Sequence, residues 1–400
     1  MQSEVHIPNM IFCMPQDLQV DTDNSLVLTG QFYGNINKDN VSLPNLSGKT
    51  FFILQVDPSG IFQWGAMCSG SGNNGSKVAI SPDAYYVTGS YSDGATFEST
   101  TLHAYGSNHN LFVARYEKNG SLSWIRHVTG PGEVHGNTIS VNKNNRIMVG
   151  GDYATYLDSL DYHNKGSYDV LLLGYTNNGK MIWANHFGGI NQDIPRAAST
   201  NGNLFSITGM FSDSLHLDDT TLVCPGANSA FIYTVDENGK RVWIRQLAGT
   251  ATVDPYGIHY RENKIYVSGY FYDNIIAENH NIPFDTINAG DLNSHYFSAC
   301  LRDETNLINS APATETAKQA IRVFPNPSHT GNFHLVIPRE NVAESIVVRD
   351  ILGRKVPCSI HPQTTSVYLI SLQEPFPPGW YFVQTSGKND FSAATRVMIE

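Results

Sequence analysis

The chain has 400 residues, a formal net charge of -11 at pH 7, 41% hydrophobic residues and only 15% charged residues. This hydrophobic content excludes a disordered chain, and no apolar run approaches the roughly 20 residues of a membrane-spanning helix. Residues 321–400 hold seven Lys or Arg and six Asp or Glu, so residues 1–320 hold 18 against 30 and carry the acidity. An acidic chain without a basic run is poorly suited to nucleic acid.

The first residues and the cysteines bear on the cell compartment. Met1 to Gln16 contain no basic segment and no apolar stretch of about 7 to 15 residues, so no secretory signal is visible. The cysteines are odd in number and form no CxxC pair: Cys13, Cys68, Cys224, Cys300 and Cys358. We interpret them as mostly unpaired, with a Cys13–Cys68 disulfide in an oxidising compartment as the alternative.

Residues 1–302 contain a repeat with two signatures. The first is a β-rich run that ends in Gly and is followed two positions later by an aromatic residue. Its glycines are 59, 62, 58 and 60 residues apart: Gly30, Gly89, Gly151, Gly209 and Gly269. The second is an apolar strand, a four-residue turn ending in Gly, and a strand that contains Trp. Its tryptophans are 60, 59 and 60 residues apart: Trp64, Trp124, Trp183 and Trp243.

The turns at 57–60, 117–120, 176–179 and 236–239 begin with a polar residue and end in Gly. This pattern predicts a type I turn that closes into a bulge, because the last position needs a positive φ. A shorter strand and an Asp or Asn turn precede four of the five Gly-aromatic runs, the fourth run being the exception. We therefore expect four antiparallel strands in two hairpins per repeat, and no useful helical periodicity is present.

A four-stranded sheet of this size is marginal alone, and both of its faces carry aromatic residues that need cover. One buried Trp removes roughly 150 to 250 Å² from water, worth about 4 to 6 kcal/mol as an upper bound. The repeated Trp therefore predicts packing between neighbouring units. Radial stacking of such sheets predicts a β-propeller of about five blades, in preference to a linear solenoid.

The fifth repeat lacks its last strand. Residues 296–301 match a third strand, but Arg302 and the residues after it provide neither a turn Gly nor a Trp. We expect residues 5–13 to supply the missing strand and close the ring, with Pro8 tolerated on an edge strand. The alternative is that Met1 is not the true start and that further blades precede it.

The repeats resemble a known bacterial family. The motifs Ala84–Gly89 (AYYVTG) and Phe231–Gly239 (FIYTVDENG) are similar to the two strand motifs of the β-propeller repeat often called SBBP. The resemblance extends over residues 1–302. It implies a propeller of the kind found on exported and surface proteins, and it implies no particular chemistry.

After the repeats, residues 303–320 are mostly polar or small and aperiodic, and we interpret them as a linker. Residues 321–400 follow as a third region. Its short strands are expected at 333–337, 345–349, 355–356, 366–370, 379–384 and 395–399. This spacing predicts a small Ig-like β-sandwich and makes the whole chain all-β.

Four ordered motifs in residues 321–400 resemble the C-terminal sorting domain of type IX secretion cargo. Their characteristic residues are Pro325, Asn326, Pro327, Gly331, Asp350, Gly353, Arg354, Gly379 and Tyr381. Trp380 and the terminal Glu400 depart from the usual pattern. The resemblance implies recognition by the type IX secretion machinery and delivery to the cell surface or medium. Such cargo also needs an inner-membrane signal, so we expect a misplaced start or a fragment.

Candidate chemical motifs have structural explanations. Gly70–Gly75 fits GxGxxG, but no helix follows to hold a phosphate, so a loop between strands is expected. Asp21–Asn24 and Asp236–Asn238 are explained as turn formers rather than calcium ligands. No zinc pattern or nucleophile motif is present, so we assign no catalytic residue, metal or cofactor. Paired carboxylates from separate blades remain an alternative that would allow glycoside hydrolysis.

The connections Gln31–Lys49 and Phe271–His295 are rich in Asn, Asp and Tyr, which suit glycans or protein surfaces, although ordinary solvated loops are the alternative. We predict a non-enzymatic exported protein whose propeller acts in binding or adhesion. The alternatives are a surface scaffold without a ligand and a glycan-active propeller hydrolase. An axial pocket lined by two or more carboxylates would favour the hydrolase, and an apolar axis would favour the scaffold.

Overall fold

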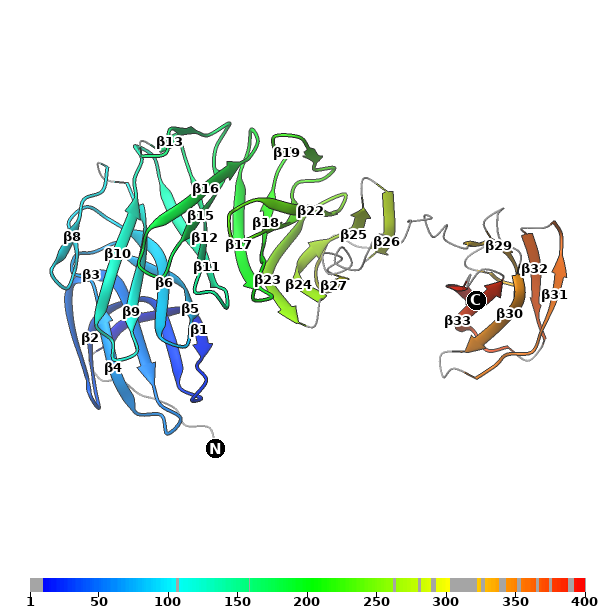
Figure 1. The fold of residues 1–400 in the computed structure, drawn as a ribbon, viewed down its shortest axis with the longest axis horizontal. Helices are drawn as coiled ribbons and strands as arrows, with labels where there is room; N and C mark the ends of the chain where they lie inside the picture. The colour runs from blue at the N-terminus through cyan, green and yellow to red at the C-terminus, as the bar shows by residue number, and fades with distance from the viewer. Residues whose placement is uncertain are drawn as a thin grey trace. The chain divides into compact units, whose positions relative to one another are not determined.

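The computed structural model describes residues 10–105, 108–157, 159–261, 264–279, 282–288, 293–302, 322–324, 328–337, 343–350, 354–364, 367–373, 376–387 and 392–399. These residues form strands, turns and bends without a helix, which confirms the all-β prediction. The chain divides into two compact units, Met1–Leu307 and Ile308–Glu400 (Figure 1). The predicted linker, residues 303–320, lies outside the described residues.

The first unit contains five antiparallel sheets of three to six strands among its described residues, together with three two-stranded hairpins. The first sheet has the order β1 (Met10–Val20), β2 (Leu26–Lys38), β3 (Val41–Val56) and β4 (Phe62–Met67). The second has β5 (Asn74–Ile80), β6 (Ala84–Tyr91), β9 (Asn110–Glu117) and β10 (Leu122–Val128). The third has β11 (Val134–Val141), β12 (Ile147–Tyr153), β15 (Asp169–Tyr175) and β16 (Met181–Phe187).

The fourth sheet has six strands, β17 (Asp193–Thr200), β18 (Phe205–Phe211), β21 (Ser229–Val235), β22 (Arg241–Ala248), β25 (Asn274–Asn279) and β26 (Ile282–Asn288). The fifth has three, β23 (Val253–Arg261), β24 (Lys264–Tyr272) and β27 (Ser294–Arg302). Small hairpins join the second and third strands of three repeats: β7 (Ala95–Phe97) with β8 (Thr100–Leu102), β13 (Tyr156–Leu157) with β14 (Tyr162–His163), and β19 (Ser214–His216) with β20 (Thr221–Val223).

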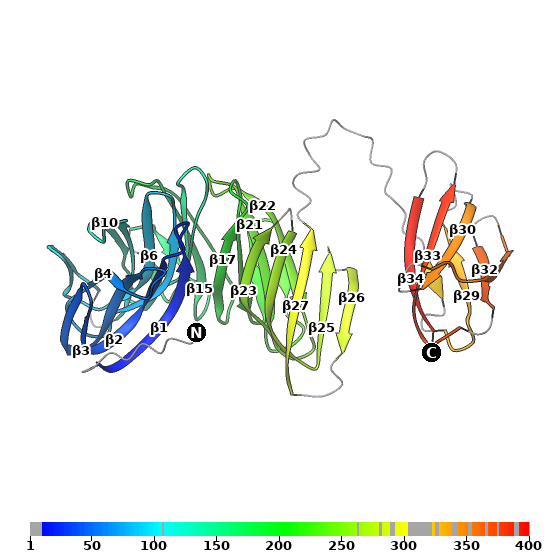
Figure 2. The same ribbon diagram turned by 90° about the horizontal axis from the view of Figure 1, so that it is seen from below.

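The sheets follow one another in a curved row. Their first strands lie side by side in the order β1, β5, β11, β17 and β23 (Figures 1 and 2). Buried apolar clusters fill the spaces between successive sheets; Phe51 and Ile53 of the first sheet, for example, pack with Tyr85 and Val87 of the second. The first strands therefore converge on one side of the row.

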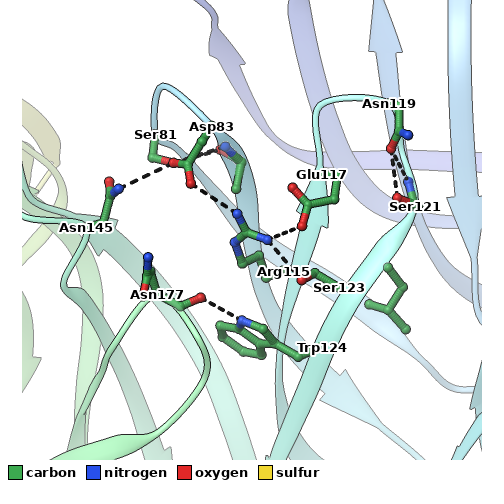
Figure 3. Close-up of polar contacts among 12 residues, drawn as sticks. Ser81, Asp83, Arg115, Glu117, Asn119, Ser121, Ser123, Trp124, Asn145 and Asn177 are labelled. Carbon is green, nitrogen blue, oxygen red and sulfur yellow. Dashed lines mark hydrogen bonds and ion pairs between the residues drawn. The ribbon is translucent and has the colours of Figure 1, made fainter.

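The tryptophans join each sheet to the next. The turn glycines Gly120 and Gly179 adopt positive φ as predicted, and the ring of Trp64 or Trp124 from the preceding sheet lies against each. Trp124 also donates its Nε1 hydrogen to the carbonyl oxygen of Asn177 in the turn of the third sheet, at 2.8 Å (Figure 3). Each of these Trp rings thus packs on a turn of the next sheet, and there is space for the ring only because the turn ends in Gly.

The same contact recurs one sheet later and then ends. Trp183 lies against Gly239 and donates its Nε1 hydrogen to the carbonyl of Glu237 at 2.9 Å. Trp243 has no such turn to meet, because the fifth sheet has three strands among the described residues. Its buried Nε1, like that of Trp64, has no partner in the same part of the chain. At the other end, nothing lies within 4 Å of a Cβ built on Gly60.

The N-terminal segment corrects the prediction of ring closure. Met10 to Cys13 belong to β1 and pair with β2 of the first sheet, with Cys13 opposite Phe32. They are therefore not the fourth strand of the fifth sheet, and residues 5–9 lie outside the described residues. The physical reason is that β2 continues to Lys38, which gives this segment a partner within its own sheet.

The outward face of the fifth sheet is also unlike an interface between sheets. The third strands place Ile53, Val113, Leu172 and Ile232 at equivalent positions, and each is buried against the next sheet. The fifth sheet has Ser298 there, and Ser298 is exposed. Repeat arrays end in units with a polar outer face, so this sheet is built to face water.

The first sheet is covered by its own β2–β3 hairpin. Ile36, Val41 and Leu43 of the extended hairpin join the buried cluster that contains Phe52 and Leu54. The Asn40 backbone N–H donates to the Phe62 carbonyl oxygen at 3.2 Å. The Phe62 backbone N–H donates to Asp39 Oδ2 at 3.0 Å. In later repeats the equivalent hairpin contacts the preceding sheet instead, and β25 pairs directly with β22.

The second unit contains two sheets among its described residues. One has the order β28 (Arg322–Phe324), β29 (Asn332–Val336), β32 (Val367–Leu372) and β31 (Cys358–Pro362). The other has β30 (Ala343–Asp350), β33 (Gly379–Gly387) and β34 (Ser392–Ile399). Residues of both sheets, including Phe333 and Val383, share one buried apolar cluster. The sequence did not predict β28 and β31.

All five cysteines are free thiols, so Cys13 and Cys68 are not joined. Burial raises the pKa of the Cys68 thiol to about 11, which keeps it protonated at neutral pH. No helix in the described part of the chain is long and apolar enough to cross a membrane.

Two turn glycines provide a matched test of the Trp contact. Gly60 and Gly239 have φ of 83° and 80°, so Ala at either position costs about 1 to 2 kcal/mol of backbone strain. Only at Gly239 does a new Cβ meet an indole ring, 2.5 Å from Cδ2 of Trp183. Urea unfolding should therefore show that Gly239→Ala loses about 1 to 3 kcal/mol more than Gly60→Ala. Equal losses would contradict the contact.

Asp193 provides a test of pH dependence. Its carboxyl is fully buried, and burial, with the nearby Asp169 charge, raises its pKa to about 8. The unfolded chain releases this proton near pH 4, so the contribution of Asp193 to stability is fully present below that value and is lost as the pH rises to about 8. Asp193→Asn should flatten the decline of Tm between pH 5 and pH 8.

The control for this variant is Asp161→Asn, because the side chain of Asp161 is 99% exposed. It should leave the pH profile of Tm unchanged. A wild-type slope that persists in Asp193→Asn would show that other groups cause it.

Candidate functional site

Each first strand contains a β-bulge opposite the Gly of the first sequence signature. In the second sheet, Gly75 pairs with Gly89 and Lys77 with Thr88, which leaves Ser76 between them without a partner. A Cβ on Gly89 would lie 1.9 Å from the carbonyl oxygen of Asn74. The glycine is therefore required where the bulged strand presses its carbonyl against the second strand.

The same arrangement occurs in all five sheets. Cβ atoms at Gly30, Gly151, Gly209 and Gly269 would lie 2.2, 2.1, 2.3 and 2.2 Å from a carbonyl oxygen of the neighbouring first strand. The residues skipped by the pairing are Gln16, Ser76, Asn137, Arg196 and Tyr256. All five line one cavity of about 500 Å³. A bulge re-aims the side chain of its extra residue, and here each sheet contributes one such side chain.

The remaining lining residues of this axial cavity come from the second, third and fourth sheets and the loop before β15. They are Lys77, His135, Asp152, Tyr168, Ile194 and Pro195. Polar and aromatic side chains predominate, and Ile194 and Pro195 are its apolar members. The cavity lining therefore combines hydrogen-bonding side chains with aromatic and apolar surface.

His135 is held by carboxylates on both ring nitrogens. Nδ1 lies 2.8 Å from Asp152 Oδ1, and Nε2 lies 2.9 Å from Glu133 Oε2. Burial disfavours the charged ring, but the hydrogen bonds and charges of the two carboxylates outweigh burial and raise the His135 pKa. The His135 ring stacks on Tyr168 with centroids 6.0 Å apart, and Asn137 donates to Asp152. This wall is fixed by contacts within the third repeat.

Arg196 forms the opposite wall. Its Nε and Nη2 lie 3.3 and 3.1 Å from the two carboxylate oxygens of Asp254, and its guanidinium lies 5.3 Å from the ring of Tyr256. Burial raises the pKa of Asp254 against the opposing effect of Arg196. This pair connects the fourth and fifth sheets across the cavity edge.

The positive charges of the cavity are matched by carboxylates. Lys77 lies 3.3 Å from Asp17, as Arg196 is paired with Asp254 and His135 with its two acids. By contrast, the side chains of Gln16, Ser76 and Tyr168 make no hydrogen bond to another residue in the described part of the chain. The groups left to meet a ligand are thus neutral donors and acceptors, together with aromatic rings.

Among the described lining residues, Asp152 is the one carboxylate, and it is engaged by His135 and Asn137. A pair of carboxyl groups facing a sugar is what glycoside hydrolysis requires. Within the same described residues, no group of three or more His, Cys, Asp or Glu could hold a metal.

The sequence-predicted repeat residues lie around this site rather than in it. The five glycines accommodate the bulges, and the four tryptophans lie on the fourth strands, remote from the first strands in each sheet. Asp21, considered as a calcium ligand, instead accepts hydrogen bonds from Tyr85 at 2.7 Å and Lys118 at 2.6 Å. Of the GxGxxG segment, Gly75 lies in β5 beside the bulge residue Ser76.

The five bulge residues were missed because they share no chemistry. Their signal is positional: each precedes the Gly of its repeat by 13 or 14 residues. Residues of such different types show no motif, although aligning the repeats on their glycines would have placed them together. The connections Gln31–Lys49 and Phe271–His295, expected to carry function, form much of the β2–β3 and β25–β26 hairpins.

The sorting-motif residues lie in the second unit. Asp350 and Arg354 form an ion pair at 2.7 Å, and the buried Tyr381 donates its hydroxyl hydrogen to the carbonyl of Pro377 at 2.6 Å. Gly331 has a positive φ of 68°, and its Cβ would lie 2.6 Å from the ring of Phe376. Gly379 begins β33. Pro325, Asn326, Pro327 and Gly353 lie outside the described residues.

Two known proteins show distant similarity to the chain. An uncharacterized WD repeat-containing protein of Acanthamoeba polyphaga mimivirus is 23% identical over 336 residues. The match covers 64% of this chain and 24% of the relative, so the chain spans about a quarter of the length of that relative. The human desmocollin-1 ectodomain structure matches 80% of this chain and 97% of its own, with 6% identity and a TM-score of 0.16, which carries no argument.

The C-terminal unit has a clear assignment. Residues 322–400 match the family model described as "Secretion system C-terminal sorting domain". This match confirms the resemblance drawn from the four sequence motifs, and it implies interaction with the type IX secretion machinery. Residues 322–400 are therefore a type IX sorting domain, and the protein is a secreted or outer-membrane surface protein.

Proposed function

We propose that the repeat unit is a propeller-type module, open between its fifth and first sheets, whose axial cavity binds a neutral carbohydrate. One observation carries the proposal: the bulge residue of every sheet lines the same cavity. Five first strands around one space are the expected geometry of radially stacked sheets. The WD-repeat relative is consistent with this architecture, since such repeats form propeller blades.

The lining favours a carbohydrate over other small ligands. Gln16, Ser76 and Asn137 provide neutral hydrogen-bonding groups, and Tyr168 and Tyr256 provide ring surfaces. Binding sites combine a few placed polar groups with aromatic walls, and a sugar presents hydroxyls and an apolar ring face to match both. The cations are neutralised by Asp17, Asp254, Asp152 and Glu133, so an anionic ligand would have to displace an existing partner.

The same features argue against the alternatives. A scaffold without a ligand would fill its axis with apolar side chains, whereas this cavity is an open space whose lining includes several hydrogen-bonding side chains. A hydrolase would place two carboxyl groups toward the cavity, whereas the described lining offers one. We therefore favour binding outside the cell, where the sorting domain delivers the protein.

Gln16 and Gln19 provide a matched test of binding. Both are exposed glutamines on β1, but only Gln16 lines the cavity. A neutral glycan identified on an array with the full chain should bind Gln16→Ala about three- to tenfold more weakly, the loss expected for one hydrogen bond. Gln19→Ala should bind as the wild type does. Absence of any neutral glycan ligand, or equal weakening by both variants, would contradict the proposal.

Deletion of residues 322–400 tests the export route. In cells with a type IX system, the full chain should reach the surface or medium, and the truncated chain should accumulate inside the outer membrane. Immunoblots of cell fractions measure this. Export of the truncated chain in normal amounts would show that another segment carries the signal.

A further inference from the structure

The fifth sheet presents a face rich in tyrosine to solvent. Tyr266 and Tyr270 of β24 and Tyr296 of β27 lie on the side away from the fourth sheet, because the residues alternating with them are buried against that sheet. Tyr296 is 91% exposed and Tyr266 is 37% exposed. Large aromatic side chains so open to water on a flat sheet commonly mark an interaction surface.

This face is continuous with the axial cavity. The ring of Tyr256, which lines the cavity, stacks on the ring of Tyr270 with centroids 5.8 Å apart and planes at 27°. Tyr270 lies directly opposite Tyr296 in the β24–β27 pair. Tyr272 adds an edge contact to Tyr270, with centroids 5.6 Å apart. A row of aromatic side chains therefore leads from the cavity wall onto the open face of the sheet.

The polar residues of this face identify the kind of partner. Ser268 lies opposite Ser298, and Cys300 lies opposite Tyr266, so hydroxyl groups and a thiol stand between the rings. The residue equivalent to Ser298 is apolar in each of the other four sheets, where a neighbouring sheet covers it. A face with serine there does not offer the apolar contact that a further sheet would need. Tyrosine with serine instead suits a ligand that combines apolar surfaces with many hydroxyls.

We propose that the tyrosine row is an extended subsite for a linear, neutral oligosaccharide whose end occupies the axial cavity. This inference rests on the proposed function of the cavity. Sugar units that leave the cavity past Tyr256 stack their ring faces on Tyr270 and Tyr296, and Ser268 and Ser298 bond to their hydroxyls. The site therefore selects for chain length, since a short sugar fills the cavity without reaching Tyr296.

Titration calorimetry of the full chain with cellobiose and cellohexaose, and with chitobiose and chitohexaose, tests the inference. In one of these series the six-unit sugar should bind at least tenfold more tightly than the two-unit sugar. Tyr296→Ala should remove most of this difference and leave two-unit affinity unchanged, whereas Gln16→Ala should weaken both lengths. Tyr105→Ala is the control, because Tyr105 is 49% exposed on the second repeat and should have no effect.

Cys300 allows the same test without mutation. Its exposed thiol shares the face with Tyr266, so the bound six-unit sugar should slow its alkylation by iodoacetamide, and the two-unit sugar should not. Equal affinity of both lengths, with Tyr296→Ala silent and Cys300 unprotected, would overturn the subsite and leave the cavity proposal intact. If none of these four sugars binds, short and long forms of a neutral glycan found on the array replace them, and absence of any such glycan would overturn both proposals. A change of oligomeric state in Tyr296→Ala would show that the face contacts protein and would also overturn the subsite.

Discussion

The repeat unit depends on one backbone contact, the approach of a bulged first strand to a glycine of the second strand. In every sheet a carbonyl oxygen lies where a Cβ would be, so any other residue would separate the two strands. The bulge that creates this contact also leaves one residue unpaired. The side chains freed in this way are Gln16, Ser76, Asn137, Arg196 and Tyr256, and they line the cavity. The regularly spaced glycines thus accommodate the bulge residues, which differ in type from one repeat to the next.

A second contact, between Trp and the next turn, holds the row of sheets together and shows where it ends. Trp64, Trp124 and Trp183 each meet a turn glycine, whereas no counterpart for Trp243 or Gly60 lies among the described residues. The first sheet is covered by its own hairpin, and Ser298 of the fifth sheet is exposed. Within the described part of the chain, the last sheet and the first share no strand.

The sequence was sufficient for features that recur at fixed spacing. The turn glycines and most strands follow from spacing, turn chemistry and alternation, and the tail follows from its motifs. The first strand of the fourth sheet was missed because Pro195 and Arg196 interrupt its pattern at the bulge. The prediction that residues 5–13 close the ring was wrong for Met10 to Cys13, because β1 is longer than its equivalents and these residues pair with β2. The cavity could not be predicted, since no single repeat contains it.

In the proposed function, five unlike side chains, each exposed by a bulge, form one carbohydrate site. A crystal structure of the full chain with cellohexaose or chitohexaose bound tests this directly. Sugar density is expected in the cavity, within hydrogen-bond distance of Gln16 and Asn137 and beside the ring of Tyr256. Sugar density at another surface of the repeat unit, with the cavity holding only water, would contradict it.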